Sequence, residues 1–172
     1  MLLGNNNQTT AASDRKDGPS GTTLSARLIN EGRYIEAWMI LEDMRPLSPA
    51  ALFNTSLCQV HAGEYASAIS SLRSAFDAAE RITPKPRKPD SPLMKTLAGL
   101  QNATGVYRLA VGDRYTERFP DILKENILRL MVDCHAELGQ WAKVFEIGTP
   151  LRGKGFANVD AAMEKAAKGQ DQ

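Results

Sequence analysis

The chain has 172 residues, of which 42% are hydrophobic and 24% are charged, as expected for one ordinary globular domain. Its 21 basic and 20 acidic residues leave a net charge of +1, so no large positive field favours nucleic acid as a partner. No apolar run approaches the roughly 20 residues needed to cross a bilayer, and we expect no contact with a membrane.

The first segment, residues 1–20, is rich in Asn, Gln, Thr, Ser and Gly. It has too little apolar surface to offset the entropy of ordering, so we expect a disordered tail. Its basic residues follow its apolar start, which is not the order of a secretory signal. Cys58 and Cys134 lie far apart in predicted helices, which favours a reducing compartment and a cytoplasmic protein.

A glycine followed two residues later by an aromatic residue occurs four times along the chain, at intervals of about 31, 42 and 34 residues. Three of the four copies have an alanine three residues beyond the aromatic residue. The pattern comprises Gly32, Tyr34, Ala37, Gly63, Tyr65, Ala68, Gly105, Tyr107, Ala110, Gly139 and Trp141.

This pattern predicts antiparallel helix pairs. A glycine accepts the left-handed conformation that ends a helix, and the aromatic residue packs at the turn between the two helices. Small residues let the helix axes approach closely. The spacing resembles the tetratricopeptide repeat (TPR), whose period is about 34 residues. The resemblance implies an all-α fold, a right-handed superhelix (α-solenoid) of about four helix pairs within residues 21–168.

The first two pairs match the pattern best. The first is apolar at helical intervals from Leu24 onward, and the second begins at Pro49 with Ser48 as its N-cap. In the third pair, Gly99 and Gly112 each weaken a helix by roughly 1 kcal/mol relative to alanine.

The fourth pair begins with a strongly apolar helix over residues 120–138, and its second helix is cut by the run from Gly148 to Pro150. We expect a final helix over residues 159–168 to cap the stack, as terminal units of solenoids must. Residues 169–172 are expected to be flexible.

An inserted loop at residues 82–91, rich in proline and basic residues, separates the second pair from the third. The surrounding stretch, residues 81–92, holds four prolines and four basic residues, a composition that favours an extended, solvated linker. Two other interpretations stay open, a docking ligand for an aromatic groove and a short basic nuclear address.

No set of residues predicts catalysis, a cofactor or a metal site. Cys58 with His61, and Cys134 with His135, could supply four metal ligands, but the whole third pair separates them. His135 is a poor base for Cys134, because neighbours on a helix point about 100° apart. The serine-hydrolase elbow and the glycine-rich phosphate loops are absent, so we expect no enzyme.

The resemblance to TPR proteins places the binding site on the concave surface, which the first helices of successive pairs line. We expect a non-catalytic adaptor or scaffold that binds a protein or peptide there. Two basic residues in this groove, both expected at the surface, suggest an acidic ligand. The predicted groove residues are Phe53, Asn54, Leu57, His61, Lys95, Thr96, Arg129 and Asp133.

One TPR subfamily binds the carboxylate of heat-shock chaperones through a clamp of lysines, asparagines and an arginine. Asn54 matches one clamp asparagine, but Arg27 and Thr23 stand where an asparagine and a lysine are expected. Asn54 is therefore expected to bond only a backbone group of a bound peptide. A secretion-type or co-chaperone and a structural subunit of a larger complex are the alternative functions, and the oligomeric state stays open.

Overall fold

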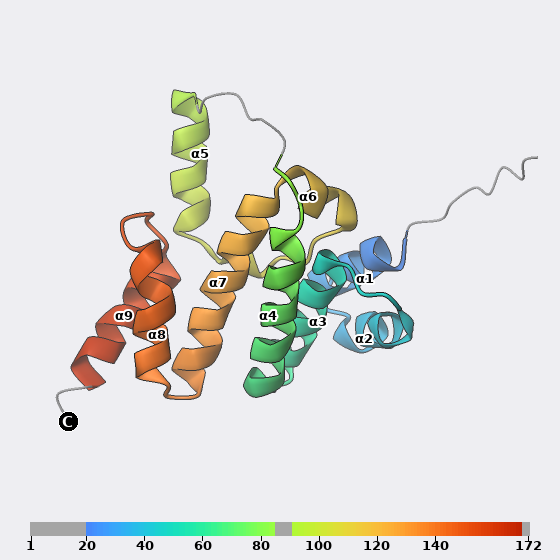
Figure 1. Cartoon of the computed structure of the whole chain (residues 1–172), viewed down its shortest axis with the longest axis horizontal. Helices are drawn as coiled ribbons and strands as arrows, with labels where there is room; N and C mark the ends of the chain where they lie inside the picture. The colour runs from blue at the N-terminus through green and yellow to red at the C-terminus, as the bar shows by residue number, and fades with distance from the viewer. Residues whose placement is uncertain (1–19, 85–90, 170–172) are drawn as a thin grey trace, which may run out of the picture.

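The computed structural model describes residues 20–84 and 91–169. Over these ranges the chain forms nine α-helices, two short 3-10 helices and no strand (Figure 1), which confirms the all-helical prediction. The elements are α1 (Gly21–Asn30), α2 (Tyr34–Asp43), α3 (Pro49–His61), α4 (Tyr65–Glu80), α5 (Pro92–Asn102), η1 (Gly105–Arg108), α6 (Asp113–Arg118), α7 (Pro120–Glu137), α8 (Trp141–Gly148), η2 (Thr149–Leu151) and α9 (Ala157–Gly169).

Three antiparallel helix pairs, α1 with α2, α3 with α4 and α7 with α8, are joined by the same turn. Gly32, Gly63 and Gly139 have φ values of 79°, 78° and 66°, in the left-handed region that favours glycine. In each turn the next residue donates its N–H to a carbonyl five residues back, as Glu64 does to Gln59 at 2.8 Å. These bonds satisfy carbonyls that the end of a helix leaves unpaired.

The prediction of a third helix pair around Gly105 is wrong. This glycine has no positive φ and begins the short helix η1. The chain is extended at Leu109 and at Gly112, so no second long helix follows. Gly112 disfavours a helix at this point of the chain, and the side chains of Asn30 and Asn54 hold the backbone between η1 and α6 instead. As a result, α4 packs directly against α7.

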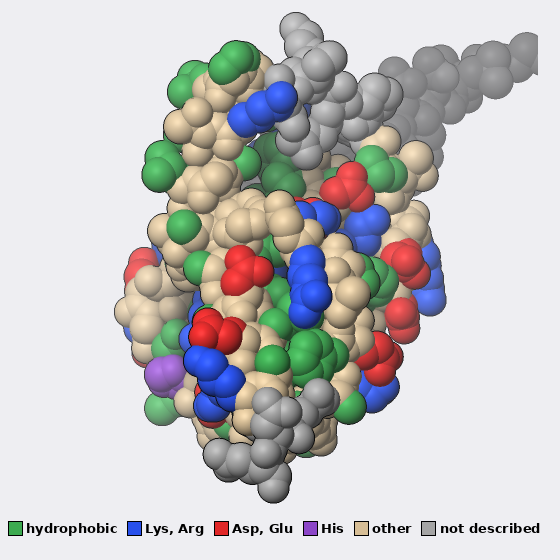
Figure 2. Space-filling model, turned by 90° about the vertical axis from the view of Figure 1, so that its left-hand side faces the viewer, with side chains coloured by type: hydrophobic (Ala, Val, Ile, Leu, Met, Phe, Trp, Pro, Cys, Tyr) green, Lys and Arg blue, Asp and Glu red, His purple; other side chains and the backbone are tan. Residues whose placement is uncertain are grey.

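The segment between α4 and α7 therefore leaves the stack. We call its part from α5 to α6, residues 92–118, the insert. Helix α5 projects from the body in Figure 1, and Figure 2 shows hydrophobic side chains along this projection. Its main contacts are with η1 at its base.

Small residues at the helix crossings are buried as predicted, with Ala37 and Ala68 fully inaccessible. The aromatic residues at the turns are less buried than expected. Tyr34, Tyr65 and Trp141 each begin the second helix of a pair and are only half-buried, because the first turn of a helix lies at the edge of the pair.

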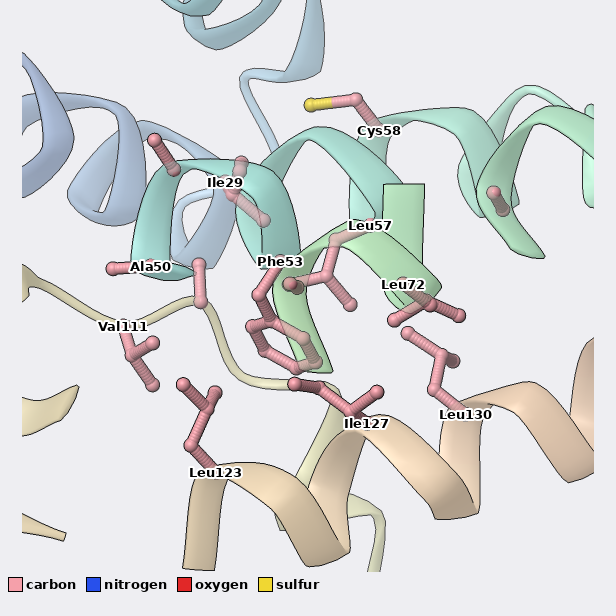
Figure 3. Close-up of a cluster of buried hydrophobic side chains, with 14 of the residues drawn as sticks. Ile29, Ala50, Phe53, Leu57, Cys58, Leu72, Val111, Leu123, Ile127 and Leu130 are labelled. Carbon is pink, nitrogen blue, oxygen red and sulfur yellow. The ribbon is translucent and has the colours of Figure 1, made fainter. Parts of the chain in front are cut away.

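The main core lies between α1, α3, α4 and α7. In Figure 3, Phe53 of α3 and Leu72 of α4 meet Leu123, Ile127 and Leu130 of α7, and all five are fully buried. These residues recur at helical intervals, which is why one face of each helix is apolar.

A second core joins α7 and α8 to α9 through Val132, Val144 and Val159. Helix α9 is slightly longer than the predicted final helix, and it packs against α7 and α8. No helix in the described ranges is both long enough and apolar enough to span a membrane.

The predicted tail overlaps the structure at one position. Ser20 belongs to the folded region rather than to the tail, because its hydroxyl accepts the N–H of Thr23 at 3.3 Å and caps α1. Three segments lie outside the described residues, namely 1–19, most of the predicted loop at 82–91, and 170–172.

The glycine turns allow a matched test of this fold. Gly63→Ala should cost about 1 to 2 kcal/mol, because a Cβ atom strains the left-handed backbone. Gly105→Ala should change stability by less than about 0.5 kcal/mol, because no atom lies within 4 Å of its added Cβ. Urea unfolding of the two variants measures both values, and equal losses would contradict the difference between the two sites.

Candidate protein-binding site

The chain's own residues between α5 and α6 fill the part of the predicted groove beside Asn54, and a pocket of about 280 Å³ next to Leu57, His61 and Leu130 stays open. Phe53, Asn54 and Leu57 are buried. Val111, from the extended segment after η1, lies among Ala50, Phe53 and Leu123 in Figure 3. A segment of the chain thus occupies the position expected for a bound peptide.

Two asparagines hold this segment by its backbone. Asn54 donates its Nδ2 to the carbonyl of Val111 at 2.9 Å and accepts the N–H of Val111 at 3.0 Å. Asn30 makes the same pair of bonds to Ala110, at 3.1 Å and 2.9 Å. We call these four bonds the asparagine clamp. The clamp binds two successive residues from α1 and α3, and it recognises backbone rather than side chains.

Arg129 holds the C-terminal end of α5, which we call the base of this helix. Its side chain is 3% exposed, and its Nη2 donates to the carbonyls of Asn102 and Thr104 at 3.0 Å and 3.2 Å. Its guanidinium carbon lies 4.0 Å and 4.5 Å from the ring centres of Tyr107 and Phe156. A cation is favourable here, because the carbonyls at the end of a helix are unpaired and carry partial negative charge.

Asp133 completes this base. It accepts hydrogen bonds from the Tyr107 hydroxyl, from Arg108 Nη2 at 2.5 Å and from Asn158 Nδ2 at 2.9 Å. Burial and the bond to Asp133 raise the pKa of Tyr107, which keeps this hydroxyl a neutral donor. Burial alone would lower the pKa of Arg108, but the bond and the charge of Asp133 raise it overall.

The structure separates the predicted groove residues into two sets. The expectation that Arg129 is exposed to an acidic ligand is wrong, because the insert and α9 surround it. His61 is exposed, and its ring stacks on that of Tyr34 with 3.7 Å between the ring centres. Lys95 and Thr96 are exposed on α5. In the second set, Asn54, Arg129 and Asp133 bond residues of the segment 102–111, Phe53 lies beside Val111 in Figure 3, and Leu57 is buried in the same core.

Helix α5 carries an apolar surface that the sequence analysis did not predict. None of its 11 residues is buried. Leu93, Leu97 and Leu100 are 67%, 50% and 63% exposed, and their spacing puts them on one face of the helix. Such apolar spacing normally marks a face packed against the core. We call these residues, together with Met94, the α5 stripe.

A second apolar surface lies on α2. Ile35, Trp38 and Met39 are exposed, and Ile35 and Trp38 form the edge of a pocket of about 380 Å³ between α2 and the end of α3. We call this the α2 surface. The pocket is lined by Tyr34, Ile35, Trp38, Cys58, Gln59, His61, Ala62 and Glu64.

Cys58 and His61 line the pocket beside α2, whereas Cys134 and His135 lie in α7. Burial raises the pKa of Cys58 to about 11, and burial with the nearby Asp133 raises that of Cys134 to about 12, so both thiols stay protonated at neutral pH. His135 is buried, with Nδ1 2.6 Å from Gln140 Oε1. Among residues 20–84 and 91–169, no three potential metal-binding side chains cluster.

No family model matches the chain, and no curated protein or solved structure matches it either.

The asparagine clamp can be tested by Asn54→Ala. This change leaves a buried N–H and a buried carbonyl of Val111 unpaired, which should cost roughly 2 to 4 kcal/mol in urea unfolding. Thr55→Ala is the matched control, because its hydroxyl bonds only the Ala51 carbonyl of its own helix. A loss for Asn54→Ala no larger than that of the control would contradict the clamp.

Arg129→Ala should cost roughly 3 kcal/mol or more, because a buried charge and its bonds to the end of α5 are lost. Lys95→Ala should change stability by less than about 0.5 kcal/mol, because Lys95 is exposed. Thermal or urea unfolding compares the two. A stable, native-like Arg129→Ala variant would show that the base of α5 is held by other contacts.

Proposed function

We propose that the protein is a non-catalytic, TPR-like interaction module that presents α5 to a protein partner. The observation that carries this proposal is that α5 has no buried residue while its stripe of leucines is exposed. Three helix pairs closed by left-handed glycines support the likeness to TPR proteins. Both cysteines are free and buried, which supports a reducing compartment such as the cytoplasm.

The energetics of α5 favour a partner that covers it. Isolated helices shorter than about 12 to 15 residues are marginal in water, and most helices in proteins are stabilised by packing. Helix α5 has 11 residues, includes Gly99 and lacks such packing. Burying a leucine side chain contributes about 1.5 to 3 kcal/mol, so covering the stripe would stabilise both the helix and the complex.

The base of α5 makes this presentation rigid. Arg129 binds the carbonyls of Asn102 and Thr104, and Asn102 Nδ2 donates to the Lys154 carbonyl at 2.8 Å. A helix held at one end loses less orientational freedom on binding than a free peptide does. The insert therefore has two roles in this proposal, because it fills part of the groove and positions the stripe.

The chemistry of α5 calls for an apolar partner surface. Lys95 is its one charged residue, and helical geometry puts it opposite the leucines. The proposed ligand is therefore apolar where it meets the stripe, rather than acidic. A structural subunit of a larger complex is the second candidate, because a permanently covered α5 would serve it equally well. A chaperone that holds an extended client along the groove would first have to displace Ala110 and Val111.

Leu97→Glu tests the proposed function. A charge in the middle of the stripe should abolish recovery of the partner in a quantitative pulldown, while melting temperature stays unchanged because Leu97 is half exposed. Lys95→Glu is the matched control on the opposite side of the same helix and should retain the partner. Equal recovery with Leu97→Glu would mean that α5 is not the binding surface.

Gly99→Ala should strengthen the same interaction. No atom lies within 4 Å of its added Cβ, and alanine favours a helix over glycine by about 0.5 to 1 kcal/mol. Alanine raises the fraction of free α5 that is helical, so a partner that binds α5 as a helix should bind up to about five times more tightly. Titration calorimetry measures this change, and weaker binding would indicate that α5 unfolds in the complex.

A further inference from the structure

Exposed large hydrophobic side chains gather on two surfaces of this molecule. Ten are exposed in the described ranges. Three belong to the α2 surface and four to the α5 stripe. Val106 and Leu109 follow α5 in the chain, and Leu138 lies apart from both surfaces. Single exposed leucines are common, whereas contiguous apolar patches mark contact surfaces.

The two surfaces have complementary shapes. The α5 stripe is a ridge, because Leu93, Leu97 and Leu100 project from a helix that is open to solvent on all sides. The α2 surface is hollow, because the pocket of about 380 Å³ opens beside Ile35 and Trp38. A helix that lays an apolar ridge into an apolar groove is a common mode of protein recognition.

Charge contributes little to this contact. Lys95, the one charged residue of α5, lies on the side of the helix opposite the leucines. Of the three acidic residues of α2, Glu36 is already paired with Arg33 at 3.0 Å, and Glu42 and Asp43 meet no basic residue of the α5 stripe. The contact therefore depends on the apolar side chains of the two surfaces.

The two surfaces cannot meet within one molecule. Helices α5 and α2 lie on opposite sides of the body in Figure 1. The base of α5 is anchored by Arg129 to α7, and α2 is packed on α1 and α3. A contact between them therefore requires a second copy of the chain, and a net charge of +1 opposes such a contact only weakly.

We infer that the protein self-associates head to tail, with the α5 stripe of one copy seated on the α2 surface of the next. This inference rests on the proposed role of α5 as a binding helix and names its partner. One such contact covers an apolar surface on each of the two copies. A contact between two different surfaces forms rings or open chains rather than closed twofold dimers.

The association should be reversible and dependent on concentration. An 11-residue helix that contacts one pocket buries an area at the low end of specific interfaces, below about 1,200 Å². Interfaces of this size are typical of weak and transient complexes. Sedimentation velocity of the wild-type protein should therefore show monomers at low concentration and successively larger species at high concentration.

Complementation between two variants tests the head-to-tail arrangement. Leu97→Glu disables the α5 stripe, and Met39→Glu disables the α2 surface; both residues are exposed, so both variants should fold. Each variant alone should be monomeric at every concentration. Their equimolar mixture should form a one-to-one dimer, because each retains the surface that the other lacks.

Three outcomes would overturn this inference. A Met39→Glu variant that still associates alone would indicate that two α5 stripes pair with each other. A mixture that stays monomeric would show that the two surfaces do not bind each other. A wild-type protein that stays monomeric would exclude self-association, while loss of a partner from Leu97→Glu in the pulldown would still support the proposed function.

Discussion

The asparagine clamp is the interaction on which the arrangement of the insert depends. A carboxamide presents a donor and an acceptor side by side, so it can pair with both backbone groups of one residue. Asn30 and Asn54 do this for Ala110 and Val111, which are buried. Without these bonds the segment would bury unpaired backbone groups, at a cost of about 1 to 3 kcal/mol each. Secondary structure cannot supply the partners, because the segment belongs to neither a helix nor a sheet.

The position of α5 follows from this clamp. Once Ala110 and Val111 are fixed on α1 and α3, η1 must lie over α7, where Tyr107 meets Arg129 and Asp133. The carbonyls that end α5 then come within reach of the buried guanidinium. A segment that would otherwise form a third helix pair thus becomes a base that holds α5 away from the core. The α5 stripe is therefore exposed because the segment that follows α5 packs in the groove in place of a third helix pair.

Much of the fold could be predicted from the sequence, because the turn that closes a helix pair is local. Gly32, Gly63 and Gly139 were identified from spacing alone, and all three adopt the left-handed conformation. Gly105 shares the spacing but not the role. Tyr107 is buried for a different reason, since its ring faces Arg129 and its hydroxyl bonds Asp133. Local spacing cannot separate these two cases.

The candidate site was harder to predict, because its contacts join residues far apart in the chain. Asn54 was expected to bond the backbone of a peptide, and it does bond a backbone, 57 residues further along its own chain. Arg129 was expected at the surface, and only its tertiary contacts reveal why it is buried. The leucine spacing of α5 is visible in the sequence. Whether such a face is covered depends on which elements pack beside it.

The segment around Ala110 and Val111 occupies part of the groove, while α5 is left uncovered. Residue-resolved amide hydrogen exchange of the dilute monomer tests both features at once. The amides of Ala110 and Val111 should exchange as slowly as those in the middle of α7, because the clamp buries them and bonds them. The amides in the middle of α5 should exchange much faster, because no tertiary packing opposes local unfolding. Rapid exchange at Ala110 and Val111, or protection of α5 equal to that of α7, would contradict the account.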